Sequence, residues 1–257
     1  MLDNKWSVVL IGAGNVGYHL GKCLWEKGFT IHCVFSRVAE KAARLAREIG
    51  AAHTSDLNTI PDDAAVYILA VGDDAIEKVA AQLRIKKGLV VHTSGSTPAA
   101  VLQPFFERFG VFYPLQTFSL SKSVDFSTIP ICVYAHASAD EDLLYKIGTH
   151  ISSKTFRIND AQRTTLHVAA VFVNNFVNYL FKIGYDLVEA ENISFDLLRP
   201  LILETAEKVQ VYPPAKMQTG PAIRGDEHTI QRHLAYLEKF PAYRKLYDDL
   251  TKYIQQL

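Results

Sequence analysis

Hydrophobic positions in residues 7–158 form short β-branched runs, and stretches with helical periodicity separate them. This alternation is typical of a parallel sheet wound with helices, because each crossover helix returns the chain to the same edge of the sheet. The expected strands are 7–11, 31–35, 66–71, 89–92, 111–113, 131–134 and 155–158. A further helix is expected to start with Thr97 as its cap and Pro98 at its first position.

The strand pattern stops after Asn159-Asp160, and the rest of the chain has helical periodicity. The expected helices are 160–190, 195–211, 228–239 and 242–256. The sequence therefore predicts an α/β fold in which a Rossmann-type parallel-sheet domain, 1–158, precedes an all-helical domain, 159–257.

A glycine motif follows the first expected strand directly. Gly12-Ala13-Gly14-Asn15-Val16-Gly17 has the spacing G-x-G-x-x-G and leads into a helical stretch. Gly12 permits a tight turn, Gly14 lets the backbone approach a pyrophosphate, and Gly17 allows close packing of helix and strand. The helix start, with Asn15 and Val16, offers N–H groups and a positive dipole end to phosphate. This arrangement predicts dinucleotide binding.

The end of the second strand distinguishes NADP(H) from NAD(H). NAD-specific domains place an acidic residue there, whereas this chain has Ser36-Arg37. A hydroxyl and a guanidinium suit a 2′-phosphate, although Arg37 could also be an ordinary solvated residue. Backbone of Val71 and Gly72 is expected to line the cofactor ribose, and Asp73 or Asp74 to cap the next helix.

Composition narrows the partners. The 257 residues include 27 basic and 27 acidic residues, so no net field favours nucleic acid or an anionic membrane. Cys23, Cys33 and Cys132 have no spacing that suggests a disulfide framework or a metal site, which fits a cytoplasmic protein. The apolar run 166–181 is interrupted by polar residues, so a buried helix is expected there rather than a membrane span.

Several segments resemble a known lineage of NADP-linked oxidoreductases. They are 12–17, 91–96, 113–118, 167–176 and 219–226. They resemble pyrroline-5-carboxylate reductase, 3-hydroxyisobutyrate and 6-phosphogluconate dehydrogenases and ketopantoate reductase, and most closely a family that joins a Rossmann-like domain to the domain of unknown function 2520. The resemblance implies NADP(H) as cofactor, a small-molecule substrate and a homodimer formed through the helical domain.

The resemblance also exposes a missing catalytic group. The related hydroxyacid dehydrogenases carry a lysine three or four residues before an Asn pair, and alignment on Asn174-Asn175 puts Val171 or Ala170 there. His167 lies one turn earlier and is the hypothetical replacement, because imidazole titrates near neutral pH. A structural histidine is the competing interpretation.

Other polar residues complete the predicted catalytic group. At helical spacing His167, Val171, Asn174 and Asn178 share one face. Asn174 or Asn175 would orient a carbonyl or imine, although buried amides also tie helices together. Ser94 would bind a substrate carboxylate or carbonyl. His92 and Tyr113 could face the ligand, but each is at least as well explained as a core residue.

Two classes of function remain open from the sequence. One is an NADP(H)-dependent oxidoreductase acting on a small carbonyl, imine or 3-hydroxyacid in an interdomain cleft. The other is a non-catalytic NADP(H)-binding redox sensor, which the missing lysine favours. Screening small oxo-acids and imines for NADPH oxidation separates the two.

Overall fold

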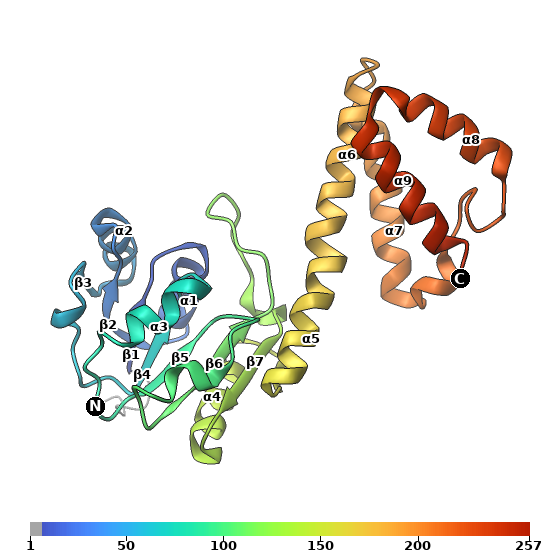
Figure 1. Cartoon of the computed structure of the whole chain (residues 1–257). Coiled ribbons are helices and arrows are strands. Elements are labelled where there is room, and N and C mark those ends of the chain that lie inside the picture. The colour runs from blue at the N-terminus through green and yellow to red at the C-terminus, as the bar shows by residue number, and fades with distance from the viewer. Residues whose placement is uncertain (1–6) are drawn as a thin grey trace. The chain divides into compact units, whose positions relative to one another are not determined.

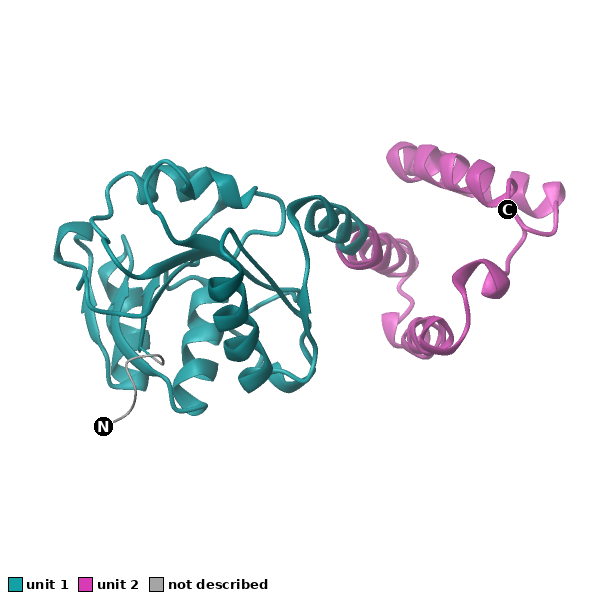
Figure 2. Cartoon of the chain, turned by 90° about the horizontal axis from the view of Figure 1, so that it is seen from below, with its two compact units in different colours: residues 1–171 teal, residues 172–257 magenta. Residues whose placement is uncertain are grey.

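The computed structural model describes residues 7–257 and divides into two compact units, Met1–Val171 and Phe172–Leu257 (Figure 2). The sequence places the domain boundary at 158/159. In the structure, helix α5 (Asp160–Ala170) belongs with the sheet, because Asp160 and Arg163 bond to the loop that follows the strand at 89–92.

The first unit is built on one eight-stranded sheet with the order β3-β2-β1-β4-β5-β6-β7-β8 (Figure 1). Its strands are β1 (Ser7–Ile11), β2 (Thr30–Phe35), β3 (Ala52–Thr54), β4 (Val66–Leu69), β5 (Leu89–His92), β6 (Phe109–Pro114), β7 (Ile131–Ala135) and β8 (Thr155–Arg157). Neighbours are parallel except β6 and β7, which are antiparallel. The Rossmann-type fold is thus confirmed. The carboxyl ends of β1, β2, β4, β5 and β6 share one edge.

Helices cover both faces of this sheet, as the alternation of side chains along β1 requires. Val8 and Leu10 belong to the hydrophobic core under α1 (Asn15–Glu26), α2 (Ala39–Ile49) and α4 (Ser138–Ile151). Val9 and Ile11 belong to the opposite core, which includes α3 (Asp73–Ala80). The result is a three-layer unit in which the strand ends stay free for a site.

The structure corrects two local expectations and adds one strand. The helix expected from Thr97 is a short 3₁₀ segment, Ala99–Leu102, with Pro98 as its cap. Gly72, not Asp73 or Asp74, caps α3, and Asp73 accepts a hydrogen bond from the Ser96 hydroxyl at 2.7 Å. Strand β3 was not expected, because it has only three residues and none is fully buried.

The second unit is all-helical within the described residues. It contains α6 (Val177–Glu189), α7 (Arg199–Val211), α8 (Glu227–Tyr236) and α9 (Pro241–Ile254). A π-helical segment, Val171–Phe176, lies between α5 and α6. Because a π-turn holds more residues than an α-turn, the expected shared face of His167, Val171, Asn174 and Asn178 does not carry through it.

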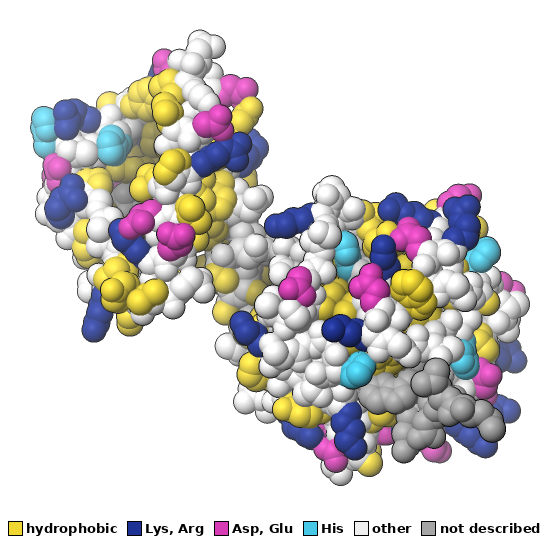
Figure 3. All heavy atoms as spheres, turned by 180° about the vertical axis from the view of Figure 1, so that it is seen from behind, with side chains coloured by type: hydrophobic (Ala, Val, Ile, Leu, Met, Phe, Trp, Pro, Cys, Tyr) yellow, Lys and Arg dark blue, Asp and Glu magenta, His cyan; other side chains and the backbone are white. Residues whose placement is uncertain are grey.

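The expectation of a buried apolar helix is wrong for a single chain. Within residues 7–257, Asp160–Glu189 is long and apolar enough to span a membrane, and its most apolar stretch has mean hydropathy 1.2 with none of it buried. Val173 is 74% and Phe172 62% exposed. Figure 3 shows hydrophobic side chains gathered on the surface of the helical unit. The chain by itself leaves this apolar face uncovered.

Candidate functional site

The glycine motif forms a cradle between β1 and α1. Gly12 has φ +118°, and a Cβ there would lie 2.2 Å from the carbonyl oxygen of Ala70. A Cβ on Gly17 would lie 1.9 Å from the carbonyl oxygen of Gly12, so only glycine lets the helix approach the turn this closely. A Cβ on Gly14, the N-cap of α1, would meet open space. This open, positively polarised helix start fits a pyrophosphate.

The neighbouring strand ends bring the other predicted cofactor residues to the same edge. The N–H of Gly12 donates to the carbonyl of Phe35 at 2.8 Å, which places Ser36-Arg37 next to the glycine turn. Ser36 is buried, and its hydroxyl accepts a hydrogen bond from the Val38 N–H at 3.2 Å. Arg37 is exposed and has no side-chain partner among residues 7–257. Its guanidinium is therefore available to an anion.

The loop after β4 borders the cradle from the other side. A Cβ on Gly12 would lie 3.2 Å from Cγ1 of Val71, so these two turns are in near contact. Gly72 is exposed and has open space above it. Backbone of Val71 and Gly72 thus lies beside the glycine turn, where the sequence places the ribose.

Asn15 plays a part that the sequence did not reveal. Its side-chain amide nitrogen donates to the carbonyl of Phe118 at 2.9 Å, so this donor is already used. One turn later, Nε2 of His19 lies 2.9 Å from the carbonyl oxygen of Ser119, and the His19 ring stacks on Phe118. Residues 115–125, here called the strap, are therefore fastened across the first turns of α1.

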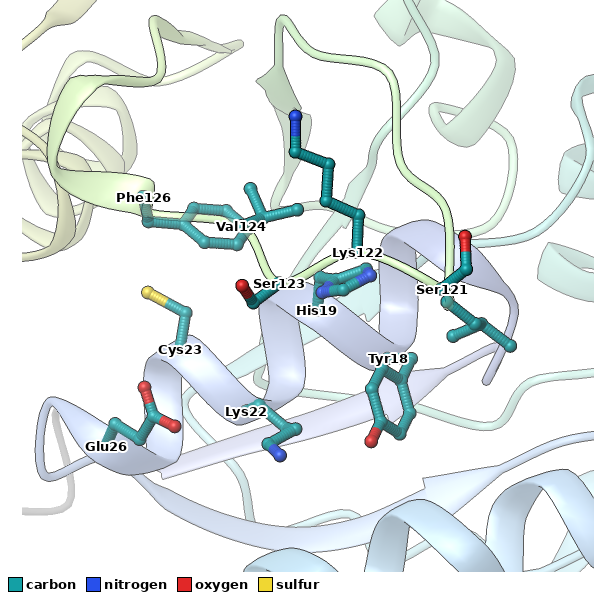
Figure 4. A pocket seen from close by; sticks show the side chains of 11 residues that line it. Tyr18, His19, Lys22, Cys23, Glu26, Ser121, Lys122, Ser123, Val124 and Phe126 are labelled. Carbon is teal, nitrogen blue, oxygen red and sulfur yellow. The ribbon is translucent and has the colours of Figure 1, made fainter.

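A surface cavity of about 290 Å³ separates α1 from the far end of the strap (Figure 4). Its charged groups do not converge, because Lys22 pairs with Glu48 at 3.0 Å and Figure 4 shows Lys22 and Lys122 pointing in opposite directions. Burial raises the pKa of the Cys23 thiol to about 12, so this group stays protonated at neutral pH. The cavity therefore offers no cluster of converging cations for an anion and no reactive thiolate.

The loop after β5 is held by Ser94. Its hydroxyl accepts hydrogen bonds from the N–H groups of Thr97 and Ser96 at 2.9 and 3.2 Å and donates to the Thr97 hydroxyl at 3.0 Å. Ser94 is 6% exposed, so its predicted contact with a substrate stays a prediction. His92 is fully buried, and its Nδ1 accepts the Ser94 N–H at 3.2 Å.

His92 is held neutral by its surroundings. Burial, followed by the positive charge of Arg163, lowers the pKa of His92 to about 4. A neutral Nδ1 can accept the hydrogen bond from Ser94, whereas a protonated one could not. His92 therefore belongs to the core and shapes the loop from below.

Tyr113 and His167 meet beside this loop. The Tyr113 hydroxyl, at the end of β6, lies 3.1 Å from Nδ1 of His167, and the two ring planes meet at 67°. Tyr113 is buried, which raises the pKa of its hydroxyl to about 12, whereas His167 is half-buried. The sequence singled out His167, and it gave Tyr113 two open interpretations, a residue facing the ligand or a core residue. The signals at Tyr113 were its position at a strand end and its place in the resembling segment 113–118, and neither pointed to His167.

Arg163 and Asp160 fix the start of helix α5, which carries His167, to the loop after β5. The Arg163 guanidinium is 1% exposed; Nη1 donates to Asp160 at 2.7 Å, and Nη2 donates to the carbonyl of Thr97. The other carboxylate oxygen of Asp160 accepts the N–H of Ala99 at 2.9 Å. These bonds fasten the first turn of α5 to the loop after β5, one helical turn before His167. Sequence reasoning missed this clamp.

Asn174 and Asn175 belong to a different compact unit from His167 and Tyr113. Both are exposed and lie in the π-helical segment, within the second compact unit. The structure brings His167, Tyr113 and the Ser94 loop together inside the first unit. Grouping the two asparagines with them remains a prediction.

Comparisons with known proteins agree with this architecture. The family described as NADP oxidoreductase coenzyme F420-dependent matches residues 7–94, and the domain of unknown function 2520 matches residues 129–254. A candidate NADP oxidoreductase from Bacteroides fragilis is 38% identical over 99% of this chain and 100% of its own, with a TM-score of 0.91. No curated protein matches the sequence significantly.

More distant solved structures share the fold. An imine reductase from Myxococcus stipitatus in complex with NADP⁺ has 17% identity and a TM-score of 0.67, covering 97% of this chain and 93% of its own. A 1-pyrroline-5-carboxylate reductase from Streptococcus pyogenes has 13% identity and a TM-score of 0.60, covering 99% and 100%. The match to the domain of unknown function 2520 includes β7, α4 and β8 as well as the helical unit. The chain belongs to the NADP oxidoreductase family that combines the coenzyme F420-dependent NADP oxidoreductase domain with this domain of unknown function.

Proposed function

We propose that this protein is an NADP(H)-dependent oxidoreductase that acts on a small carbonyl or imine, or on a 3-hydroxyacid in the reverse direction. The observation that carries the proposal is the shared sheet edge. The glycine cradle ends β1, and the paired side chains of Tyr113 and His167 lie at the end of β6 on that edge. A phosphate cradle and a proton-transfer group on one edge suit a cofactor-dependent reduction.

The chain would hold the cofactor mainly through backbone and one guanidinium. The cradle of Gly12, Gly14 and Gly17, with N–H groups at Asn15 and Val16, receives the pyrophosphate. Val71 and Gly72 border the ribose, and Ser36 with Arg37 receives the 2′-phosphate of NADP(H). NADPH, when bound, supplies the hydride that forms the new C–H bond.

His167 would supply the matching proton. In the reductive direction the protonated imidazole donates from Nε2 to the substrate oxygen or nitrogen, and the neutral ring then takes a proton from water. The carbonyl becomes an alcohol, or the imine an amine, and one proton is consumed per turnover. Ser94, Asn174 and Asn175 are proposed to orient the substrate through hydrogen bonds. His167 thereby replaces the lysine that the hydroxyacid dehydrogenases use.

The apolar face of the long helix is proposed to be covered by a second copy of the chain in a cytoplasmic homodimer. The large exposed side chains on this helix include Val168, Phe172, Val173, Phe176, Tyr179 and Leu180. Such a contiguous patch marks an interface in a water-exposed protein. Sedimentation should give a dimer, and Val173→Glu should weaken it, while Trp25→Glu on α1 should not. A wild-type monomer would contradict the dimer.

A substrate screen tests the catalytic proposal. Small oxo-acids, ketones and imines are mixed with NADPH, and loss of the reduced-nicotinamide absorbance is followed. With an accepted substrate, His167→Ala should lower kcat by about a hundredfold or more, while NADPH affinity stays unchanged. The matched control is His53→Ala, since His53 is exposed on the short strand β3. Tight NADPH binding without turnover of any compound would favour the redox-sensor alternative.

A further inference from the structure

The Tyr113 hydroxyl contacts the imidazole ring of His167 through one ring nitrogen only. Nδ1 lies 3.1 Å from the Tyr113 hydroxyl, whereas Nε2 has no hydrogen-bond partner among residues 7–257. The two ring nitrogens of histidine are chemically distinct, and the partner of one decides what the other can do. The contact with Tyr113 therefore affects which ring nitrogen of His167 can exchange a proton.

We propose that Tyr113 is a positioning residue that fixes His167 through Nδ1 and leaves Nε2 as the atom that exchanges a proton with the substrate. This inference rests on the proposed function. A phenol suits the task because its oxygen can accept from Nδ1–H and its O–H can donate to a bare Nδ1. The ring keeps its bond in both protonation states of Nδ1.

The phenol remains in its neutral form throughout. Because Tyr113 is buried, the pKa of its hydroxyl is raised to about 12, so it neither loses its proton at neutral pH nor adds a negative charge beside the imidazole. Tyr113 thus orients the ring without itself taking part in proton transfer. A carboxylate in its place would act differently, since it only accepts hydrogen bonds when ionised.

Gly95 makes the close approach of these two side chains possible. A Cβ at this position would lie 2.5 Å from Nδ1 of His167 and 2.8 Å from Cζ of Tyr113. Both distances are far below ordinary contact, and both neighbours are ring atoms of packed side chains. Any side chain at position 95 would have to push the imidazole away from the hydroxyl. Gly95 is therefore needed for the contact between Tyr113 and His167.

The test compares Tyr113→Phe, which removes one oxygen and keeps the ring, with the wild type. Nitrogen NMR on histidine-labelled protein reports the tautomer ratio of His167, whose signals are assigned from their loss in His167→Gln. We expect Tyr113→Phe to change this ratio. It should also lower kcat roughly tenfold at unchanged KM, because the variant loses one hydrogen bond. Gly95→Ala should reproduce both effects.

The matched control is Tyr134→Phe, because Tyr134 lies on the adjacent strand β7 and has no bond to His167. It should leave the His167 signals unchanged. Identical nitrogen shifts in Tyr113→Phe and wild type would overturn the proposal, even if Gly95→Ala failed to fold. The NMR measurement needs no substrate, so it separates this inference from the proposed function, which fails if no compound is turned over.

Discussion

Arg163 and Asp160 form an ion pair in the first turn of α5, with Nη1 2.7 Å from Oδ1 and the Arg163 side chain 1% exposed. Both residues also bond to the loop after β5 through Thr97 and Ala99. The pair thus fixes α5 to the sheet, and with it the position of His167. A buried charge that loses its partner is costly, which makes the pair testable.

Replacing Asp160 with Ala should lower the free energy of unfolding by about 1–3 kcal/mol, because the buried Arg163 guanidinium loses its carboxylate, which is itself 35% exposed, and keeps its bond to Thr97. Chemical denaturation followed by circular dichroism measures the change. Arg47→Ala serves as the control, since Arg47 is exposed on α2, and should change stability by less than about 0.5 kcal/mol. Equal effects of the two substitutions would show that the clamp contributes nothing.

Two glycines of the cradle should respond differently to the same substitution. Gly14→Ala introduces a methyl group into open space, so thermal stability should be retained while the Kd for NADPH rises by about tenfold or more. Gly17→Ala places a Cβ 1.9 Å from the Gly12 carbonyl and should lower the melting temperature as well. Calorimetry and thermal unfolding distinguish the two. Unchanged NADPH affinity in Gly14→Ala would show that the pyrophosphate does not bind beside Gly14.

The buried His92 predicts a specific loss of stability in mild acid. Its pKa is lowered from 6.5 to about 4, so the unfolded chain binds this proton more readily than the folded one. The contribution of His92 is complete above about pH 6.5 and should disappear as the pH falls to about 4, at a cost of up to about 3 kcal/mol.

Denaturation curves at several pH values, compared between wild type and His92→Asn, isolate this contribution. The variant should show a shallower loss of stability between about pH 6.5 and 4. His53→Gln, at an exposed position, should retain the wild-type slope. Parallel slopes for wild type and His92→Asn would contradict a neutral buried His92.

The strap should loosen when His19 is replaced. His19→Ala removes the bond to the Ser119 carbonyl and the stacking on Phe118, so trypsin should cut after Lys122 several times faster. Limited proteolysis with mass spectrometry measures the rate. Tyr18→Phe changes the neighbouring residue, whose hydroxyl bonds to Glu48 and not to the strap, and should leave the rate unchanged. Equal cutting rates would mean that His19 does not hold the strap.

Much of the first unit could be predicted because its signals are local. An apolar strand followed by Gly12, Gly14 and Gly17 specifies a turn whose physical demands are carried by those residues alone. The seven expected strands are all present, and the missed strand β3 has too few buried residues to produce a hydrophobic pattern. The all-helical character of the second unit followed from the same periodicity.

The contacts around His167 could not be predicted, because they join distant parts of the chain. Tyr113 and His167 are 54 residues apart, and neither neighbourhood carries a motif that announces the other. The π-helical segment after Ala170 also escaped, since periodicity assumes an α-helix throughout. The exposed Phe172 shows a further limit of prediction from sequence. An apolar helix face indicates that the face is buried, but it does not say whether the same chain or a second chain covers it.

The central claim is that the glycine cradle and Arg37 together select the phosphorylated cofactor. Calorimetric titration of the folded protein with NADPH and NADH, in wild type and Arg37→Ala, tests it most directly. We expect wild type to bind NADPH at least about tenfold more tightly than NADH, and Arg37→Ala to lose that preference while keeping its NADH affinity. No heat with either dinucleotide, or an unchanged preference in Arg37→Ala, would contradict the account.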